Sequence, residues 1–273
     1  MKERIIVAVV LLPLAFVILV YLPPYVLVGA VSLICALAAH ELLCAITGIK
    51  GNVRICIYSM VSAALIPVGV YFDLSLIIFP TVLLTLLSLV FIDAIARYKT
   101  DKQYPFLHIL VALFGGLLIP YMLSFIVSLR LMHGGRLLVL LPIISAFVTD
   151  AGAYFTGIFL GKHKAFPLVS PKKTVEGCIG GIVIGTSAML LYGVAIANLS
   201  SYNVSYWALL VYGILGAVMS ELGDLAFSLV KREFDIKDYG RILLGHGGML
   251  DRFDSMIFTA PAIYLLSLAM PVL

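Results

Sequence analysis

Residues 205–230 read SYWALLVYGILGAVMSELGDLAFSLV, and this stretch decides the fold class. It is apolar apart from a few polar side chains in its second half, and Lys231 and Arg232 follow it directly. The hydrocarbon core of a bilayer is about 30 Å thick, so a helix needs roughly 20 mostly apolar residues to cross it. The stretch is therefore long enough to span a membrane as one helix.

The rest of the chain repeats this pattern. Of its 273 residues, 63% are hydrophobic and 12% are charged, and the mean hydropathy is +1.15, which no soluble globular domain shares. We therefore predict an all-α, polytopic integral membrane helix bundle that forms a single transmembrane domain over residues 1–273. Apolar runs predict about nine spans, at 5–21, 25–46, 55–72, 74–94, 106–129, 137–160, 178–197, 205–230 and 255–272.

Lysines and arginines are distributed unevenly over these nine spans. All 18 of them except Arg130 and Arg136 fall on one side of the membrane. Because basic loop residues mark the cytoplasmic side, we expect a multi-pass protein of the cytoplasmic (inner) membrane with its N-terminus in the cytoplasm. The longest polar loops, 161–177 and 231–254, then face the cytoplasm too. The net charge of +4 is thus a topology signal, and no nucleic-acid partner is expected.

The polar residues of the stretch 205–230 are costly inside a membrane. An ionisable side chain in a spanning helix costs a few kcal/mol or more, which makes each one a functional candidate. Glu221, Asp224, Ser228 and Lys231 follow spacings of three and four residues, so they share one helix face. Asp224 is either an ion-pair partner that ties two helices together or a ligand for a hard cation that binds phosphate oxygens.

A glycine-rich segment precedes the last span and reads GHGGMLDRFDS over residues 245–255. Glycines let the backbone approach a ligand closely. If the last helix begins near Gly248, Asp251 and Asp254 point the same way, and a helix-dipole effect explains one such acid more easily than two. With Asp224 opposite, they would make an oxygen-rich site suited to Mg²⁺.

The other long loop contains SPKKTVEG at residues 170–177. Ser170 and Thr174 are natural helix caps, and two lysines beside a helix start can hold a polyphosphate. Basic residues in such loops can also be topology markers alone. Upstream of this loop, Asp150 lies within the span 137–160, about 16 Å from the loop along the helix.

Fewer polar signals occur in the N-terminal half. Glu41, beside His40, is a further acid within the membrane, and the sequence does not identify its partner. The four cysteines form no CxxC pair and no Cys/His cluster, so we expect packing residues with free thiols. They are Cys35, Cys44, Cys56 and Cys178.

These motifs together resemble the signature of the phosphatidate cytidylyltransferase (CDP-diacylglycerol synthase) family. The matching elements are SLVKR at 228–232, KDYG at 237–240, HGG at 246–248, LDRFD at 250–254, SPKKTVEG at 170–177 and residues 150–161. They all lie in the C-terminal half, about 137–273. One departure is Leu244, where the family has proline or another small residue. A proline would stiffen this loop, but no charged or glycine position beside the histidine is lost.

The resemblance implies that CTP and phosphatidic acid react in a Mg²⁺-dependent way, with one or two cations, to give CDP-diacylglycerol and pyrophosphate in phospholipid biosynthesis. Two anions must be brought together, so the site must supply positive charge. Expected metal ligands are Asp224, Asp251 and Asp254. Expected catalytic residues are Asp224, Asp251, Lys172, Lys173, Arg252 and His246, the histidine in a positioning role. Expected substrate-binding residues are Asp150, Ser170, Thr174, Glu176, Ser228, Lys231, Arg232, Lys237, Asp238, Gly247 and Gly248.

Two other classes of function stay open. An ion-coupled transporter would use the acids Glu41, Asp150 and Asp224 as an ion path, although its acids should be spread over both sides of the membrane. A related CTP-using enzyme would be a lipid kinase, which leaves CDP, or a cytidylyltransferase acting on another lipid. A homodimer is compatible with the sequence, which does not require one.

Overall fold

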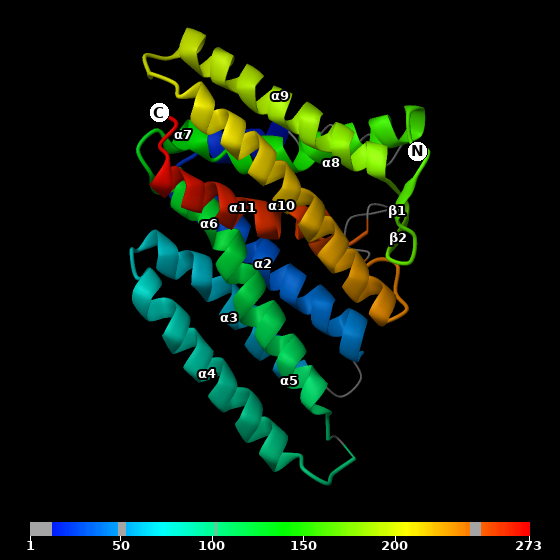
Figure 1. The fold of residues 1–273 in the computed structure, drawn as a ribbon. Coiled ribbons are helices and arrows are strands. Elements are labelled where there is room, and N and C mark those ends of the chain that lie inside the picture. The colour runs from blue at the N-terminus through cyan, green and yellow to red at the C-terminus, as the bar shows by residue number, and fades with distance from the viewer. Residues whose placement is uncertain (1–12, 49–52, 102, 241–246) are drawn as a thin grey trace. The chain divides into compact units, whose positions relative to one another are not determined.

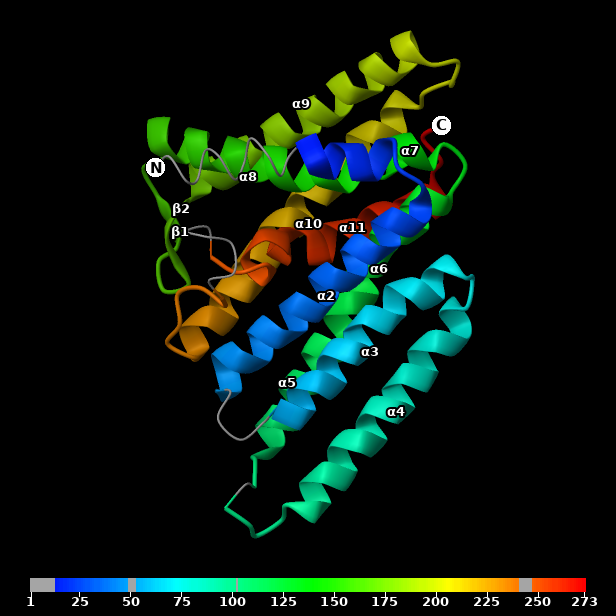
Figure 2. The same cartoon turned by 180° about the vertical axis from the view of Figure 1, so that it is seen from behind.

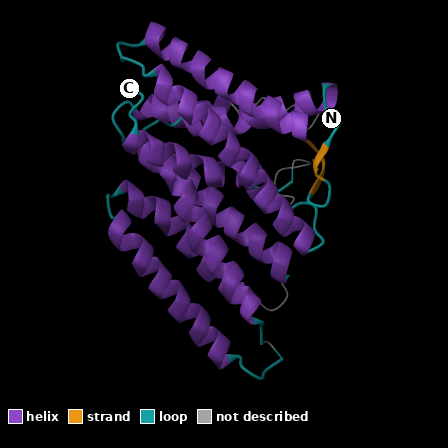
Figure 3. Cartoon of the chain, in the orientation of Figure 1, coloured by secondary structure: helices purple, strands orange, loops and turns teal. Residues whose placement is uncertain are grey.

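The computed structural model describes residues 13–48, 53–101, 103–240 and 247–273, and most of them are helical (Figure 3). Its helices are α2 (Pro24–Thr47), α3 (Val53–Tyr71), α4 (Ser75–Ala96), α5 (Phe106–Leu113), the π-helix η1 (Phe114–Leu118), α6 (Ile119–Leu131), α7 (Gly135–Leu138), α8 (Leu141–Phe159), α9 (Val175–Leu199), α10 (Tyr206–Glu233) and α11 (Leu250–Ala269). Two short antiparallel strands, β1 (Lys164–Phe166) and β2 (Ser170–Thr174), precede α9.

Seven helical segments of the described residues are long and apolar enough to cross a membrane. They are Pro24–Thr47, Val53–Tyr71, Ser75–Ala96, Phe106–Leu131, Gly135–Phe159, Val175–Leu199 and Tyr206–Glu233. Each lies within a few residues of a predicted span. Helix α11 overlaps the predicted last span over residues 255–269 but is not among the seven, and the described part of the first span is helical from residue 13 to residue 20. The prediction of an all-α, multi-pass membrane protein is confirmed.

The chain divides into two compact units. The first comprises residues 1–131 and 236–252, and the second comprises residues 132–235 and 253–273. The boundary within α11 separates Arg252 from Phe253, so the glycine-rich segment contributes residues to both units. That residues 1–273 form one transmembrane domain stays a prediction.

In the first unit, α2 and α3 lie side by side, and α5, η1 and α6 pack against them (Figure 2). The glycines of η1 allow this close packing. A Cβ on Gly116 would lie 2.7 Å from Ser59 Oγ of α3, and one on Gly115 would lie 3.3 Å from Leu42 of α2. Ser59 also donates a hydrogen bond to the Ala112 carbonyl, 3.0 Å away. Small residues let helices approach where a membrane supplies no hydrophobic driving force.

In the second unit, α9 packs against both α8 and α10, which also contact each other, and the hairpin of β1 and β2 lies at the N-terminal end of α9 (Figure 1). Gly177, Gly181 and Gly185 are four residues apart on α9 and face α8. A Cβ on Gly181 would lie 2.9 Å from Cβ of Ala153 and 3.0 Å from Glu221 Oε1 of α10. This glycine row brings α8 and α10 close together around the polar residues that they carry.

Candidate active site

Residues 161–177, here called the lysine loop, contain the hairpin of β1 and β2 and continue directly into α9. Thr174 caps that helix, because its Oγ1 accepts a hydrogen bond from the Gly177 N–H at 3.1 Å. Ser170 lies instead in β2, opposite Phe166, so the expectation that it caps a helix is wrong. The sequence around Ser170 is compatible with a helix cap or a strand, and its pairing with β1 places it in a strand.

Glu176 ties the start of this loop to the first turn of α9. Its Oε2 accepts hydrogen bonds from the backbone N–H groups of Lys162 and His163, at 3.1 and 3.2 Å. Its Oε1 lies 2.6 Å from Nδ1 of the His163 ring. Glu176 thus has a clear role in holding the loop, and its contact with substrate stays a prediction.

Lys173 brings two carboxylates of α10 together. Its ammonium lies 3.1 Å from Oδ2 of Asp224 and 3.8 Å from Oε2 of Glu221, and its side chain is 11% exposed. Glu221 and Asp224 therefore share one helix face, as predicted. Asp224 does form an ion pair, but its partner Lys173 lies in β2 and not on another helix, and the role of Asp224 as a cation ligand stays a prediction.

The charge of Lys173 is secured by this pairing. Burial lowers the pKa of its ammonium, but the charges of Asp224 and Glu221 and the hydrogen bond to Asp224 outweigh burial, so the pKa of Lys173 is raised above its ordinary value. The ammonium therefore stays charged at neutral pH.

Asp150 and Asp254 add two more carboxylates. Oδ1 of Asp150 lies 3.4 Å from Oγ of Ser220, and its Oδ2 accepts a hydrogen bond from Ser255 Oγ at 3.2 Å. Asp254 is buried; its Oδ1 accepts the Ser255 N–H at 2.8 Å, and its Oδ2 lies 4.0 Å from the Lys231 ammonium. The charges of Asp150 and Asp254 both interact with that of Asp224.

These side chains form one acidic cluster within the second unit. Four carboxylates accompany two ammonium groups, so two formal negative charges are in excess. One carboxylate oxygen, Glu221 Oε1, is buried without a hydrogen-bond partner among the described residues. Such oxygens are the ligands that Mg²⁺ prefers, but among the described residues no three of these carboxylates bring ligand atoms within 4.8 Å of one another. The members of the cluster are Asp150, Lys173, Glu221, Asp224, Lys231 and Asp254.

Asp251 belongs to the first unit and holds together the described residues around it, 237–240 and 247–252, here called the signature segment. Its Oδ2 accepts hydrogen bonds from the backbone N–H groups of Tyr239 and Gly248, at 2.9 and 3.0 Å. Gly247 has a φ of +82°, which only glycine adopts without strain, and a Cβ there would lie 3.2 Å from Asp251 Oδ2. That Asp251 joins Asp224 around a cation stays a prediction, since the two belong to different units.

Glu41 of α2 is held by the same segment. It is 2% exposed, and its Oε2 accepts the Leu250 N–H at 2.8 Å. A Cβ on either Gly240 or Gly248 would lie 2.6 Å from its carboxyl carbon. Among the described residues, the partner that the sequence did not identify is therefore a backbone N–H group. The only signals in the sequence were a buried acid and, far along the chain, two glycines.

The remaining predicted residues lie in several places. Ser228 is buried on α10, and Arg232 donates from Nε to the Val169 carbonyl at 3.2 Å. His246 lies outside the described residues. Exposed residues are Lys172, Lys237, Asp238 and Arg252.

The chain is similar to a known protein family and to several curated proteins. The model of the cytidylyltransferase family matches residues 2–270. A phosphatidate cytidylyltransferase of Staphylococcus saprophyticus is 42% identical over 128 residues, 47% of this chain and 48% of that protein. One of Bacillus subtilis (strain 168) is 48% identical over 118 residues, 43% of this chain and 42% of that protein. The chain thus spans about half the length of the curated relatives it matches.

Proposed function

The chain belongs to the cytidylyltransferase family, and from that premise we propose that it transfers the cytidylyl group of CTP to phosphatidic acid. The products are CDP-diacylglycerol and pyrophosphate. The observation that carries this proposal is the acidic cluster, in which Lys173 sits between Asp224 and Glu221 at the membrane end of the lysine loop. The relatives named phosphatidate cytidylyltransferase support the choice of lipid.

Mg²⁺ is the cofactor that we propose for this cluster. Asp224 and Asp254, with the unpartnered Oε1 of Glu221, would hold it, and Asp251 stays a predicted ligand. When bound, the ion supplies positive charge to the phosphate oxygens and aligns the reacting groups.

The protein's own cations supply the rest of the positive charge. An ammonium has three N–H donors, so Lys173 can keep its bond to Asp224 and still donate to a phosphate oxygen. Lys231 is placed in the same way beside Asp254. The attacking phosphate of the lipid is already ionised at neutral pH, so no residue needs to act as a strong base.

A lipid substrate explains a site within membrane helices. The acyl chains can stay in the bilayer while the headgroup reaches the cluster, which avoids about 0.8 kcal/mol for each CH₂ drawn into water. We propose the cytoplasmic membrane as the location, with the lysine loop on the cytoplasmic side, because CTP is there and because the basic loop residues favour that side.

One assay tests the proposed reaction. Purified protein in detergent is incubated with labelled CTP, phosphatidic acid and Mg²⁺, and both the lipid and the water-soluble products are analysed. Lipid-soluble cytidine with release of pyrophosphate supports the proposal. Release of CDP with a phosphorylated lipid would identify a kinase instead. A second assay, in sealed vesicles, would identify a transporter by ion flux without use of CTP.

A further inference from the structure

Three soft metal ligands meet in the first unit, among residues that have no part in the proposed reaction. His40 and Cys44 lie one turn apart on α2, and Cys56 lies in the first turn of α3. One ligand atom from each residue lies within 4.8 Å of the others. The expectation that these cysteines form no Cys/His cluster is therefore wrong, because Cys56 is brought to the pair by the packing of α3 on α2.

The geometry within the pair already resembles that of a metal site. Zn²⁺ binds sulfur at about 2.3 Å and imidazole nitrogen at about 2.0 Å in a tetrahedron, which places such ligands about 3.5 Å apart. Cys44 Sγ lies 3.4 Å from Nε2 of His40. Two thiolates on one Zn²⁺ are about 3.8 Å apart, so Cys56 must approach by about 1 Å or less.

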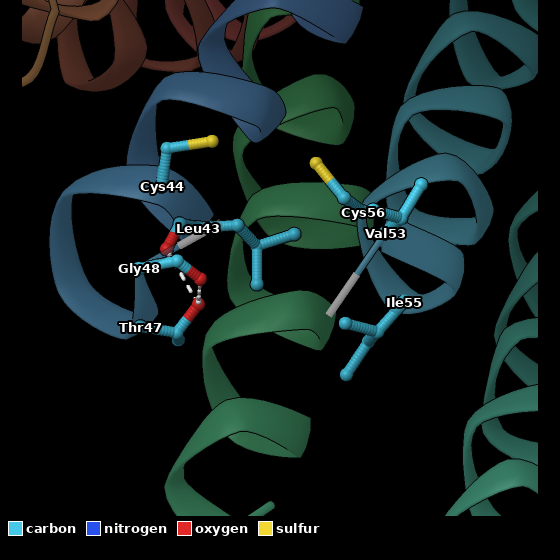
Figure 4. Close-up of a pocket in the computed structure, with 7 residues that line it drawn as sticks. All are labelled: Leu43, Cys44, Thr47, Gly48, Val53, Ile55 and Cys56. Atoms are coloured by element: carbon cyan, nitrogen blue, oxygen red, sulfur yellow. Dashed lines mark hydrogen bonds between the residues drawn. The ribbon is translucent and has the colours of Figure 1, made fainter. Parts of the chain in front are cut away.

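The three ligands are partly exposed and lie near the ends of α2 and α3. All three residues are half-buried. Figure 4 shows the sulfur atoms of Cys44 and Cys56 pointing toward one another across a small pocket between α2 and α3. Thr47 and Gly48, where α2 ends, and Val53, where α3 begins, also line this pocket. The pocket thus lies at the ends of the two helices.

The chemistry of the ligands selects the class of ion. Two thiols and one imidazole favour soft or borderline cations such as Zn²⁺, whereas Mg²⁺ requires oxygen ligands. Binding would release one proton from each thiol, and the two thiolates then neutralise the charge of the divalent ion. A half-buried site tolerates this neutral complex better than it tolerates a charged one.

We propose that His40, Cys44 and Cys56 bind one thiophilic divalent cation of the Zn²⁺ class. Structural zinc sites are closed by four protein ligands, whereas three protein ligands leave the fourth position to water or another small ligand. The fourth ligand of the bound ion can therefore exchange. Because His40 precedes Glu41, a bound ion also fixes the turn of α2 that holds the Leu250 N–H.

Titration with Co²⁺ tests the proposal without any activity measurement. The full chain is purified, its affinity tag is removed, and a non-metal-binding reductant keeps the thiols reduced. We expect a thiolate-to-cobalt charge-transfer band and the intense d–d bands of a tetrahedral site, saturating at one ion per chain. Zn²⁺ should abolish both bands, and a large excess of Mg²⁺ should leave them unchanged.

Variants and X-ray absorption then assign the ligands. Cys44→Ser and Cys56→Ser should each lose stoichiometric binding, while Cys35→Ala, which alters a buried cysteine of α2, should keep it. The zinc absorption spectrum of the unaltered protein should show two sulfur ligands and at least one imidazole. The proposal is overturned if the reduced protein gives no charge-transfer band, if a variant that combines Cys44→Ser with Cys56→Ser retains the band, or if zinc shows only oxygen and nitrogen ligands.

Discussion

Lys173 is the residue on which the charge balance of the acidic cluster depends. Its ammonium is close to both Asp224 and Glu221, so it offsets the repulsion between two carboxylates one turn apart. In the proposed reaction the same ammonium also offers positive charge to a phosphate. A single side chain thereby serves the fold and the proposed reaction, and substitutions around it should separate the two roles.

Asp224→Asn tests the reaction at this position. The amide is nearly the same size as the carboxylate, but it neither binds a cation well nor pairs with Lys173. We expect CTP-dependent turnover to fall by about 100-fold or more, while the protein stays folded with Lys173 still near Glu221. Asp235→Asn alters an exposed acid just beyond α10 and serves as the control. A near-normal rate in Asp224→Asn would remove this residue from the proposed metal site.

The pH dependence of stability tests the ion pair. Because the pKa of Lys173 is raised, its stabilising contribution is fully present below the ordinary lysine pKa of 10.5 and is lost as the pH rises through the raised pKa. The difference in unfolding midpoint between the unaltered protein and Lys173→Met should therefore shrink as the medium becomes strongly alkaline. The exposed neighbour gives the control, Lys172→Met, for which no such convergence is expected. A constant difference for Lys173→Met would contradict the pairing.

At the scale of elements, the contact between α2 and the signature segment depends on Glu41. Glu41→Ala leaves the buried Leu250 N–H without its acceptor, which should cost about 1–3 kcal/mol. Gly240→Ala introduces a Cβ that meets the Glu41 carboxyl and should cost a similar amount, about 1–3 kcal/mol. The two substitutions together should cost less than their sum, because Glu41→Ala makes room for the new Cβ.

Thermal unfolding of the two single variants, the double variant and Glu41→Gln measures this coupling. The glutamine keeps a carbonyl acceptor for the Leu250 N–H and should retain most of the stability. Strict additivity of the two alanine substitutions would show that Glu41 and Gly240 do not meet.

The packing of α8 against α9 depends on its glycine row. Gly181→Val places methyl groups where Ala153 and Glu221 already lie, so we expect a loss of about 1–3 kcal/mol in stability and a lower rate of cytidylyl transfer. Gly29→Val in α2 provides the comparison, because a Cβ there meets nothing within 4 Å. Equal unfolding midpoints for the two variants would show that the row does not set the approach of these helices.

The sequence predicts those features that depend only on neighbouring residues of the same segment. Long apolar runs give the spans, and the spacing of Glu221 and Asp224 gives their common face. Three features depend on a partner elsewhere in the chain: the Leu250 N–H for Glu41, Cys56 for the pair on α2, and Lys173 for Asp224. A backbone group leaves no trace in the sequence, and a basic residue of a loop is indistinguishable from a topology marker until the loop is placed.

At the scale of the whole molecule, the distribution of basic residues makes an orientation testable. Single cysteines are introduced by Asp235→Cys, beyond α10, and by Ser201→Cys, between α9 and α10, after the four native cysteines are replaced. The two positions flank one spanning helix, so they must face opposite sides of the membrane. Because the segment 231–254 contains five lysines and arginines and the segment 198–204 contains none, Ser201→Cys should react with a membrane-impermeant maleimide in intact cells. Asp235→Cys should react only after the cells are opened, and the reverse pattern would place the lysine loop on the side that lacks CTP.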